Sequence, residues 1–207
     1  MPDSVGPIEN PFVARLVRPG AIAYLPPPDV DLEHLIDRFF ALQCRGSIVG
    51  PHGTGKSAFT AEFARRLTER RKEVVFVELH QAANRLPDRT FARAVPGAVM
   101  VVDGYEQLSV VVRRSLRAWT RLRGCGLFVT CHRPLGLPVL YRTRPDREQA
   151  RRIVAHLQQS HEAPSLIEPA DVDAAFDRHE GNLREIMFDL YDLYEIRRDR
   201  IAQNSPD

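Results

Sequence analysis

The sequence predicts an α/β fold of three layers, in which helices cover both faces of a parallel sheet, followed by a small helical lid. Short β-branched runs such as SIV and AVMVV alternate with segments whose apolar residues recur every three or four positions. Strands that alternate with helices are joined by crossovers, so the strands should be parallel. From Pro145 onward only the helical pattern continues, which predicts a helical bundle after the sheet.

The elements divide the chain into three parts. An extended arm covers residues 1–30 and ends in a proline-rich stretch. The α/β core covers 31–144, and the helical lid and tail cover 145–207. Strands are expected at 47–49, 73–80, 98–103, 126–132 and 137–143. Helices are expected at 30–42, 56–73, 106–123, 146–157, 169–181 and 182–198, with one helical turn between 81 and 97.

The stretch GPHGTGKS matches the phosphate-loop pattern G-x-x-x-x-G-K-[ST] at every fixed position. It follows a predicted strand and opens a predicted helix, which is the context that the pattern requires. Backbone N–H groups at the start of a helix bind phosphates, Lys56 would reach the β- and γ-phosphates, and the Ser57 hydroxyl would bind Mg²⁺. The predicted nucleotide-binding residues are Gly50, Pro51, His52, Gly53, Thr54, Gly55, Lys56, Ser57 and Ala58.

An acidic residue at the end of another predicted strand supports the same site. VMVVDGYEQL resembles a Walker B strand, and Asp103 closes its apolar run. Ligands of open parallel sheets bind outside the carboxyl ends of the strands, where Asp103 would hold Mg²⁺ through water. The alternative is an ordinary strand-ending Asp that caps the next helix.

The run ENPF…RPGAIAYLPPPDVDLEHLIDRFF…SIVGPHGTGKSAF resembles the opening of bacterial AAA+ ATPases of the GspA secretion type and of transposition helpers. The resemblance spans most of residues 8–190. It implies that Thr130 or His132, in GLFVTCHRP, senses the γ-phosphate, and that Arg184, in HEGNLREI, is a second sensor on a lid helix. Asn182 and Glu185 form an N-x-x-[EQ] cap that would place Arg184 in the first turn. A polar strand end and a surface arginine are the alternatives.

The catalytic base is where the chain departs from these relatives. They usually carry Asp-Glu at the end of the Walker B strand, whereas Asp103 is followed here by Gly104. Glu106 and Glu78 are the two candidate bases, and His80 would share the strand face of Glu78. We favour Glu106 narrowly, the alternative being that it only caps the following helix, where an acid is favourable.

The function implied is Mg-ATP binding with slow or partner-stimulated hydrolysis to ADP and phosphate. Two alternatives stay open. One is an adaptor that binds ATP with little hydrolysis, and the other is a small-molecule or nucleotide kinase whose lid would include RTRPDREQARR. A preference for ATP over GTP is not decided by these residues. Phe12 and Tyr24 are candidates to line the pocket for the nucleotide base.

A basic stripe marks the helix expected after Asp103. Arg113, Arg117 and Arg121 recur every four residues, with Arg114 and Arg123 nearby. Three interpretations stay open: a solvated face, an arginine that completes a neighbouring subunit's site in a homo-oligomer, or contacts with nucleic-acid phosphates. The arginines to test for completing a neighbour's site are Arg114, Arg117, Arg121 and Arg133. Trp119 and Leu122 are expected to face the core.

Composition places the chain among ordinary globular proteins. Hydrophobic residues make up 43%, charged residues 27%, and the net charge is +2. No apolar run approaches the ~20 residues of a membrane span. MPDSVGPIENPF lacks the basic start and apolar core of a secretory signal, so a cytoplasmic location is expected. The three cysteines have no metal spacing and are expected to be buried.

Overall fold

The computed structural model describes residues 10–13, 24–79, 89–160 and 165–204, so His80 lies outside the described residues. The chain divides into two compact units. One is Pro28–Arg144. The other combines Met1–Pro27 with Pro145–Asp207.

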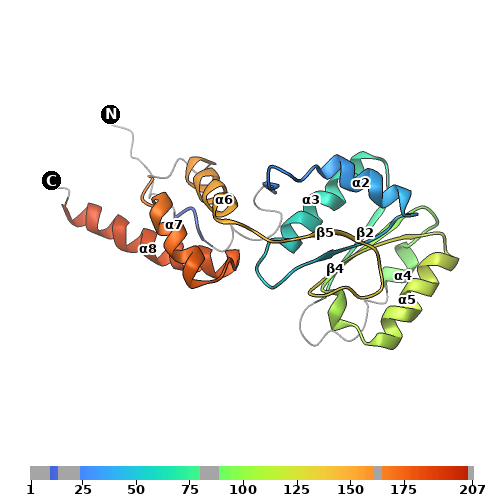
Figure 1. The fold of residues 1–207 in the computed structure, drawn as a ribbon. Coiled ribbons are helices and arrows are strands. Elements are labelled where there is room, and N and C mark those ends of the chain that lie inside the picture. Colours follow the sequence, from blue (N-terminus) through green and yellow to red (C-terminus); the bar gives the residue numbers. More distant parts are fainter. Residues whose placement is uncertain (1–9, 14–23, 80–88, 161–164, 205–207) are drawn as a thin grey trace. The chain divides into compact units, whose positions relative to one another are not determined.

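The first unit contains a five-stranded sheet in the order β2-β3-β4-β1-β5, with every pair parallel (Figure 1). The strands are β1 (Arg45–Val49), β2 (Val74–Glu78), β3 (Val99–Asp103), β4 (Gly126–Cys131) and β5 (Val139–Arg142). Strand β4 lies between β1, which leads into the phosphate loop, and β3, which ends at Asp103. The predicted parallel α/β architecture is therefore confirmed.

Helices cover both faces of this sheet (Figure 1). They are α2 (Leu32–Ala41), α3 (Lys56–Glu69), α4 (Arg89–Arg93) and α5 (Val110–Leu122). On the face of α2 and α3, Phe39, Phe63 and Phe128 pack with ring centroids 4.2–5.8 Å apart. On the opposite face, Leu116 of α5 packs against Leu127 and the other buried residues of the same cluster. Strand alternation explains why Phe128 and Leu127 serve different layers.

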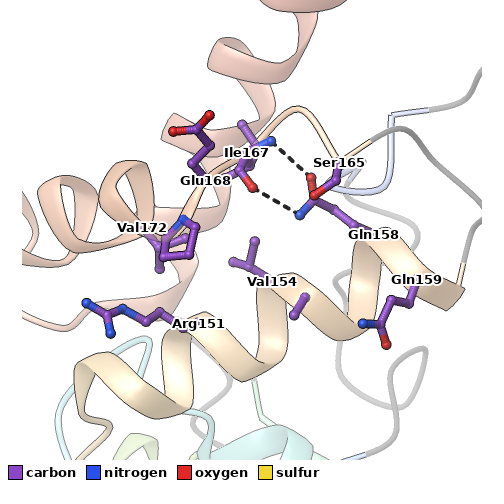
Figure 2. Close-up of a pocket in the computed structure, with 10 residues that line it drawn as sticks. Arg151, Val154, Gln158, Gln159, Ser165, Ile167, Glu168 and Val172 are labelled. Atoms are coloured by element: carbon purple, nitrogen blue, oxygen red, sulfur yellow. Dashed lines mark hydrogen bonds between the residues drawn. The ribbon is translucent and has the colours of Figure 1, made fainter.

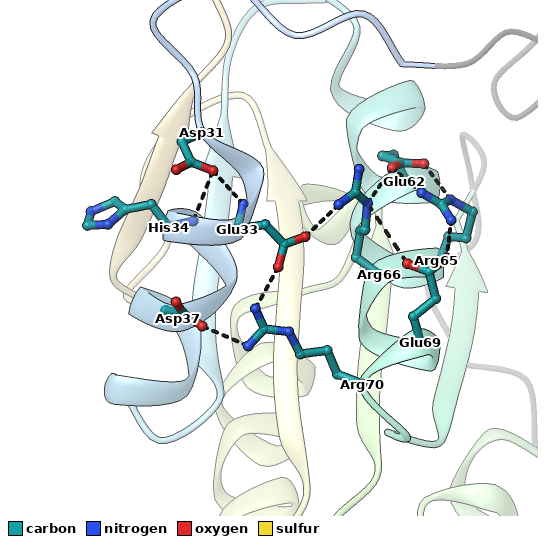
Figure 3. A network of polar contacts seen from close by, with 9 residues as sticks. All are labelled: Asp31, Glu33, His34, Asp37, Glu62, Arg65, Arg66, Glu69 and Arg70. Atoms are coloured by element: carbon teal, nitrogen blue, oxygen red, sulfur yellow. Dashed lines mark hydrogen bonds and ion pairs between the residues drawn. The ribbon is translucent and has the colours of Figure 1, made fainter.

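Helices α2 and α3 are joined by a surface network of charges (Figure 3). Asp31 caps α2 by accepting from the N–H groups of Glu33 and His34. The Glu33 carboxylate in turn accepts from Arg66 and Arg70 of the α3 segment, each at 2.5 Å. Exposed pairs of this kind contribute roughly 0–1 kcal/mol each, so the aromatic core dominates the packing of these helices.

Helix α5 begins at Val110, later than the sequence predicts. Gly104 has φ +82° and starts a single 3₁₀ turn over Tyr105–Gln107. Ser109 then caps α5 by accepting from Val112 N–H at 3.3 Å. Glu106 is therefore outside the first turn of α5, and the interpretation of Glu106 as a cap of the basic helix is wrong.

The expectations that Leu122 faces the core and that all three cysteines are buried need correction. Trp119 is half-buried against the core, as expected, but Leu122 is 87% exposed. Leu122 lies in the last turn of α5, about 120° around the helix from the buried Leu116, which explains its exposure. All three cysteines are free thiols. Cys125 and Cys131 are buried and Cys44 is only half-buried.

The second unit is a bundle of α6 (Arg147–Ser160), α7 (Pro169–Arg178) and α8 (Leu183–Asn204). Part of the N-terminal segment packs into it. Phe12 is 1% exposed and meets Tyr194 edge to face, which leaves no surface to line a nucleotide base. Asn10 donates to Tyr191 O at 3.1 Å and to Glu195 at 2.7 Å. Within the described residues, no helix is long and apolar enough to cross a membrane.

Candidate functional site

The phosphate loop connects β1 to α3, and α3 begins at Lys56 itself. Lys56 is buried, and its Nζ donates to Gly50 O at 2.8 Å and to Pro51 O at 2.5 Å. Backbone carbonyls at the start of the loop therefore hold the ammonium group of Lys56. Phosphate oxygens are stronger acceptors for an ammonium group than neutral carbonyls, so this lysine is suited to bind an anion there.

Gly50 is required by close packing against the end of β5. A Cβ atom at Gly50 would lie 2.0 Å from the Thr143 hydroxyl oxygen, well inside contact distance. The Thr143 hydroxyl in turn lies 2.6 Å from the Thr54 hydroxyl, which also donates to Pro51 O at 2.9 Å. Thr143 is not among the site residues predicted from the sequence. Its one signal was a polar residue at the carboxyl end of the strand YRT.

Asp103 is held by the predicted sensor Thr130. The Thr130 hydroxyl donates to Asp103 Oδ1 and accepts from Gly104 N–H at 2.9 Å. Thr130 is buried at the end of β4, next to β3 in the sheet. The arrangement orients one carboxylate oxygen of Asp103 through a neutral donor.

Glu106 and His132 form a second polar contact at the same edge. Glu106 Oε1 lies 3.2 Å from His132 Nδ1, and the His132 and His52 rings have centroids 3.8 Å apart. The other oxygen, Oε2, is buried and has no hydrogen-bond partner among the described residues. Burial lowers the pKa of His132, with Lys56 and His52 acting in the same direction and Glu106 opposing them. His132 is therefore neutral at pH 7, so the contact joins a neutral imidazole to the Glu106 carboxyl group.

Burial is also the main cause that raises the pKa of Cys131, to about 11, and the Glu106 carboxylate adds to it. The thiol is protonated at pH 7 and unreactive, because the thiolate is the nucleophilic form. Cys131 is a core residue beneath the polar cluster.

Glu78 lies at the end of β2, in register with Asp103 of β3. Residues in register on neighbouring strands point to the same face, so Glu78 and Asp103 share one side of the sheet. Glu78 is exposed, and it adjoins the metal-binding candidate and not His132. Tertiary structure thus brings both candidate bases to the same edge but pairs them with different neighbours.

The oxygen donors at this edge suit Mg²⁺. Ser57 lies in the first turn of α3 and Asp103 ends β3, so each offers a hard oxygen ligand of the kind that Mg²⁺ binds. The described residues contain no group of three or more His, Cys, Asp or Glu that could hold a metal by themselves. A cation here would therefore take its remaining ligands from nucleotide phosphates and water, as Mg²⁺ commonly does. Ala58 follows Ser57 in the same turn.

No protein-family model matches the chain, and no curated protein matches it either. Three solved structures of variants of RuvB, from Thermotoga maritima, are similar in structure. Their sequence identities are 14%, 15% and 14%, with TM-scores of 0.52, 0.52 and 0.53. The alignments cover 76%, 76% and 75% of this chain, and 60%, 60% and 58% of the RuvB chains. This chain therefore shares the three-layer α/β fold of those RuvB structures. It spans about three fifths of the length of those RuvB chains.

Most of the remaining candidate residues lie on helices, and Arg133 lies in the loop after β4. Arg184 is exposed in the first turn of α8, where its N–H and that of Glu185 are capped by the Asn182 side chain. Arg117 donates to Leu135 O and Gly136 O, at 3.2 and 3.0 Å, and so braces the loop after β4. Among the other arginines considered, Arg113 is half-buried and Arg114, Arg121, Arg123 and Arg133 are exposed.

The second unit has a groove of its own between α6 and α7 (Figure 2). Its volume is about 310 Å³, and Gln158 closes one side by accepting from Ile167 N–H at 3.0 Å and donating to Ile167 O at 3.2 Å. None of the residues that line it belongs to the phosphate loop. The groove residues are Arg151, Val154, Ala155, Gln158, Gln159, Ser165, Ile167, Glu168, Pro169 and Val172.

Proposed function

We propose that this protein binds Mg-ATP and hydrolyses it slowly or on stimulation by a partner. The observation that supports this most is the phosphate loop itself, in which Lys56 is buried across the loop at the carboxyl end of a parallel sheet. The adjacent Asp103 is oriented by Thr130 from the strand inserted between β1 and β3. The AAA+ fold agrees with this function, because ligands bind at this edge of such sheets.

The proposed roles follow from these contacts. Loop N–H groups and Lys56 would bind the phosphates, and Ser57 with Asp103 would hold Mg²⁺, which would supply positive charge beside the phosphates. Thr130 orients Asp103. Glu106 accepts the proton of the attacking water, and His132, whose Nδ1 lies 3.2 Å from Glu106 Oε1, positions Glu106.

Gly104 explains why hydrolysis should be slow. The usual glutamate next to the Walker B aspartate cannot be accommodated here, because Gly104 has φ +82° and a Cβ would lie 2.7 Å from Leu79 O. The base must come from Glu106 or Glu78, neither of which is adjacent to Asp103. This departure also favours the second candidate, an adaptor that binds ATP with little turnover.

Four further points belong to the proposed function. The protein resembles GspA-type and transposition-helper ATPases, it prefers ATP, Arg184 acts as a second sensor, and a second copy completes the site. A kinase remains the third candidate. A kinase would transfer the γ-phosphate of ATP to an acceptor molecule, whereas an ATPase transfers it to water. Detecting a phosphorylated acceptor would therefore distinguish the kinase.

Lys56→Ala tests the central claim. This variant should lose Mg-ATP binding, measured by calorimetric titration, while circular dichroism and the melting temperature show an intact fold. Arg71→Ala is the matched control, because it removes an exposed cation from the end of the α3 segment. ATP binding by Lys56→Ala that equals that of the parent would overturn the phosphate-loop assignment.

A further inference from the structure

Thr143 lies directly after β5, beside the start of the phosphate loop. The residue is buried, at 5% exposure, and its N–H donates to Val49 O at 2.9 Å. This bond continues the parallel pairing of β1 and β5 to the last residue of β1. The residue after Val49 is Gly50, the first of the loop, so the sheet itself holds Thr143 in place against the loop.

Two threonine hydroxyls meet at this place. The Thr54 hydroxyl donates to Pro51 O at 2.9 Å, and the hydroxyl oxygens of Thr54 and Thr143 lie 2.6 Å apart. A hydroxyl has a single hydrogen to donate. Since that of Thr54 goes to Pro51 O, Thr143 is the donor in the shorter contact and Thr54 is its acceptor. The hydrogen bonds therefore form a chain from Thr143 through Thr54 to Pro51 O, in which each bond strengthens the next.

The Pro51 carbonyl joins this chain to the lysine of the loop. It accepts from Lys56 Nζ as well as from the Thr54 hydroxyl. Proline has no N–H, so its carbonyl is the backbone group of residue 51 that forms hydrogen bonds, and a carbonyl oxygen turned toward a phosphate would repel it. A phosphate bound by Lys56 would take the ammonium group away from this carbonyl. The Thr54 hydroxyl would then be the donor that still holds Pro51 O.

Gly50 leaves room for the pair of hydroxyls. A Cβ atom at this position would lie 2.0 Å from the Thr143 hydroxyl oxygen and 3.0 Å from the Thr54 hydroxyl oxygen. A larger residue at position 50 would therefore push the two hydroxyls out of contact. The hydrogen bond between them depends on three segments that pack closely: the first residue of the loop, its fifth residue and the end of β5.

We propose that Thr143 is a positioning residue for the phosphate loop. By donating to Thr54 it holds the Pro51 carbonyl in its hydrogen bonds, which leaves the loop N–H groups and Lys56 to bind the phosphates of a nucleotide. This inference rests on the proposed binding of Mg-ATP. The alternative is that Thr143 only ends the sheet, in which case its hydroxyl would affect the stability of the protein and not its affinity for ATP.

Thr143→Ala and Thr143→Ser form the matched pair that tests the proposal. Both variants lose the methyl group, and only the serine keeps the hydroxyl. Calorimetric titration with Mg-ATP should show an affinity about tenfold lower for Thr143→Ala, the size of effect expected for one hydrogen bond. Thr143→Ser should bind within about twofold of the parent, because a hydroxyl at the same position can make the same bond.

Two further measurements separate positioning from a role in stability alone. The loss for Thr143→Ala should be the same with and without Mg²⁺, and the same for ADP as for ATP, because the loop N–H groups bind phosphates that both nucleotides share. Thr120→Ala is the control for a lost buried hydroxyl. Thr120 accepts from Arg45 at 2.7 Å, and Arg45 is the first residue of β1, at the other end of the strand from the loop. This variant should lower the melting temperature and leave ATP affinity unchanged.

A double variant tests whether Thr143 acts through Thr54. Thr54→Ala removes the hydroxyl that bonds Pro51 O directly, so the variant with both alanines should bind ATP as weakly as Thr54→Ala alone. Losses that simply add would contradict the proposed chain. Thr143→Ala with the parent's affinity would overturn the inference and leave the proposed function intact, whereas a parent protein that binds no ATP would overturn both.

Discussion

The Glu106 carboxylate lies 3.2 Å from Nδ1 of His132, at the end of β4. The His132 ring in turn packs against His52 of the phosphate loop, and the second Glu106 oxygen is buried without a partner among the described residues. A carboxylate held by one oxygen and free at the other can accept a proton from a water molecule. This contact is why we assign the base to Glu106 ahead of Glu78.

Glu106→Gln should reduce ATP turnover on the order of a hundredfold, because it removes a positioned proton acceptor. Mg-ATP binding should be unchanged. Steady-state phosphate release and calorimetric titration check the two halves of this expectation. Glu78→Gln is the matched control and should have little effect. The reverse result would move the role to Glu78, and no effect from either variant would favour the adaptor that binds ATP without catalysis.

Thr130→Val should weaken Mg²⁺-dependent ATP binding while the protein still folds. Valine has nearly the shape of threonine but loses the donor to Asp103 and the acceptor for Gly104 N–H. The unpaired groups should cost roughly 1–3 kcal/mol of unfolding free energy. ATP affinity should fall more with Mg²⁺ present than without it, as for Asp103→Asn. Thr130→Ser keeps the hydroxyl and should behave like the parent, whereas equal losses with and without the metal would contradict the role of Asp103.

Gly50→Ala should destabilise the protein by about 1–3 kcal/mol and weaken nucleotide binding. The added methyl would meet the Thr143 hydroxyl at 2.0 Å and the Thr143 carbonyl at 2.9 Å. Thr143→Ala in the same chain should recover part of the stability, because it removes the first clash and keeps the second. Chemical denaturation of the single and double variants measures the coupling. Strictly additive losses would indicate that the two residues do not touch.

The stability of the protein should fall as the pH is lowered from 7 to 5. Burial lowers the pKa of His132, so in this range the unfolded chain binds a proton that the folded chain does not. The stability that depends on a neutral His132 is present above the ordinary pKa of histidine, about 6.5, and is lost as the pH falls below it. Melting temperatures of His132→Gln should therefore depend less on pH than those of the parent. His34→Gln, at an exposed position on α2, should keep the parent's pH dependence.

Turnover per subunit should rise with protein concentration if a second copy supplies an arginine to the site. Arg133 is the position to test first, because it is exposed directly after His132, whereas Arg117 is engaged by loop carbonyls. Arg133→Ala should lower turnover and leave ATP binding intact, as measured by phosphate release over a range of protein concentration. A flat concentration dependence for the parent would indicate a site complete within one chain.

The sequence by itself determined the α/β class and the place of the phosphate loop. These depend on local rules: apolar runs that alternate with helical periodicity, and a glycine-rich turn that ends at Lys56. The same rules placed α8, because Gly181 and Asn182 end one helix and cap the next. They failed at the start of α5, where the left-handed Gly104 and the Ser109 cap replace the expected continuous helix.

Only the tertiary structure decided which polar groups meet. The order of the strands is set by packing across the whole sheet, and it places Thr130 beside Asp103 and His132 beside Glu106. A polar residue at a strand end does not reveal the contact of Thr143 with Gly50, since it joins residues 93 positions apart in the chain. The exposure of Leu122 and the burial of Phe12 were decided in the same way. Helical and strand periods predict which residues share a face, but only the packed neighbours determine whether that face is covered.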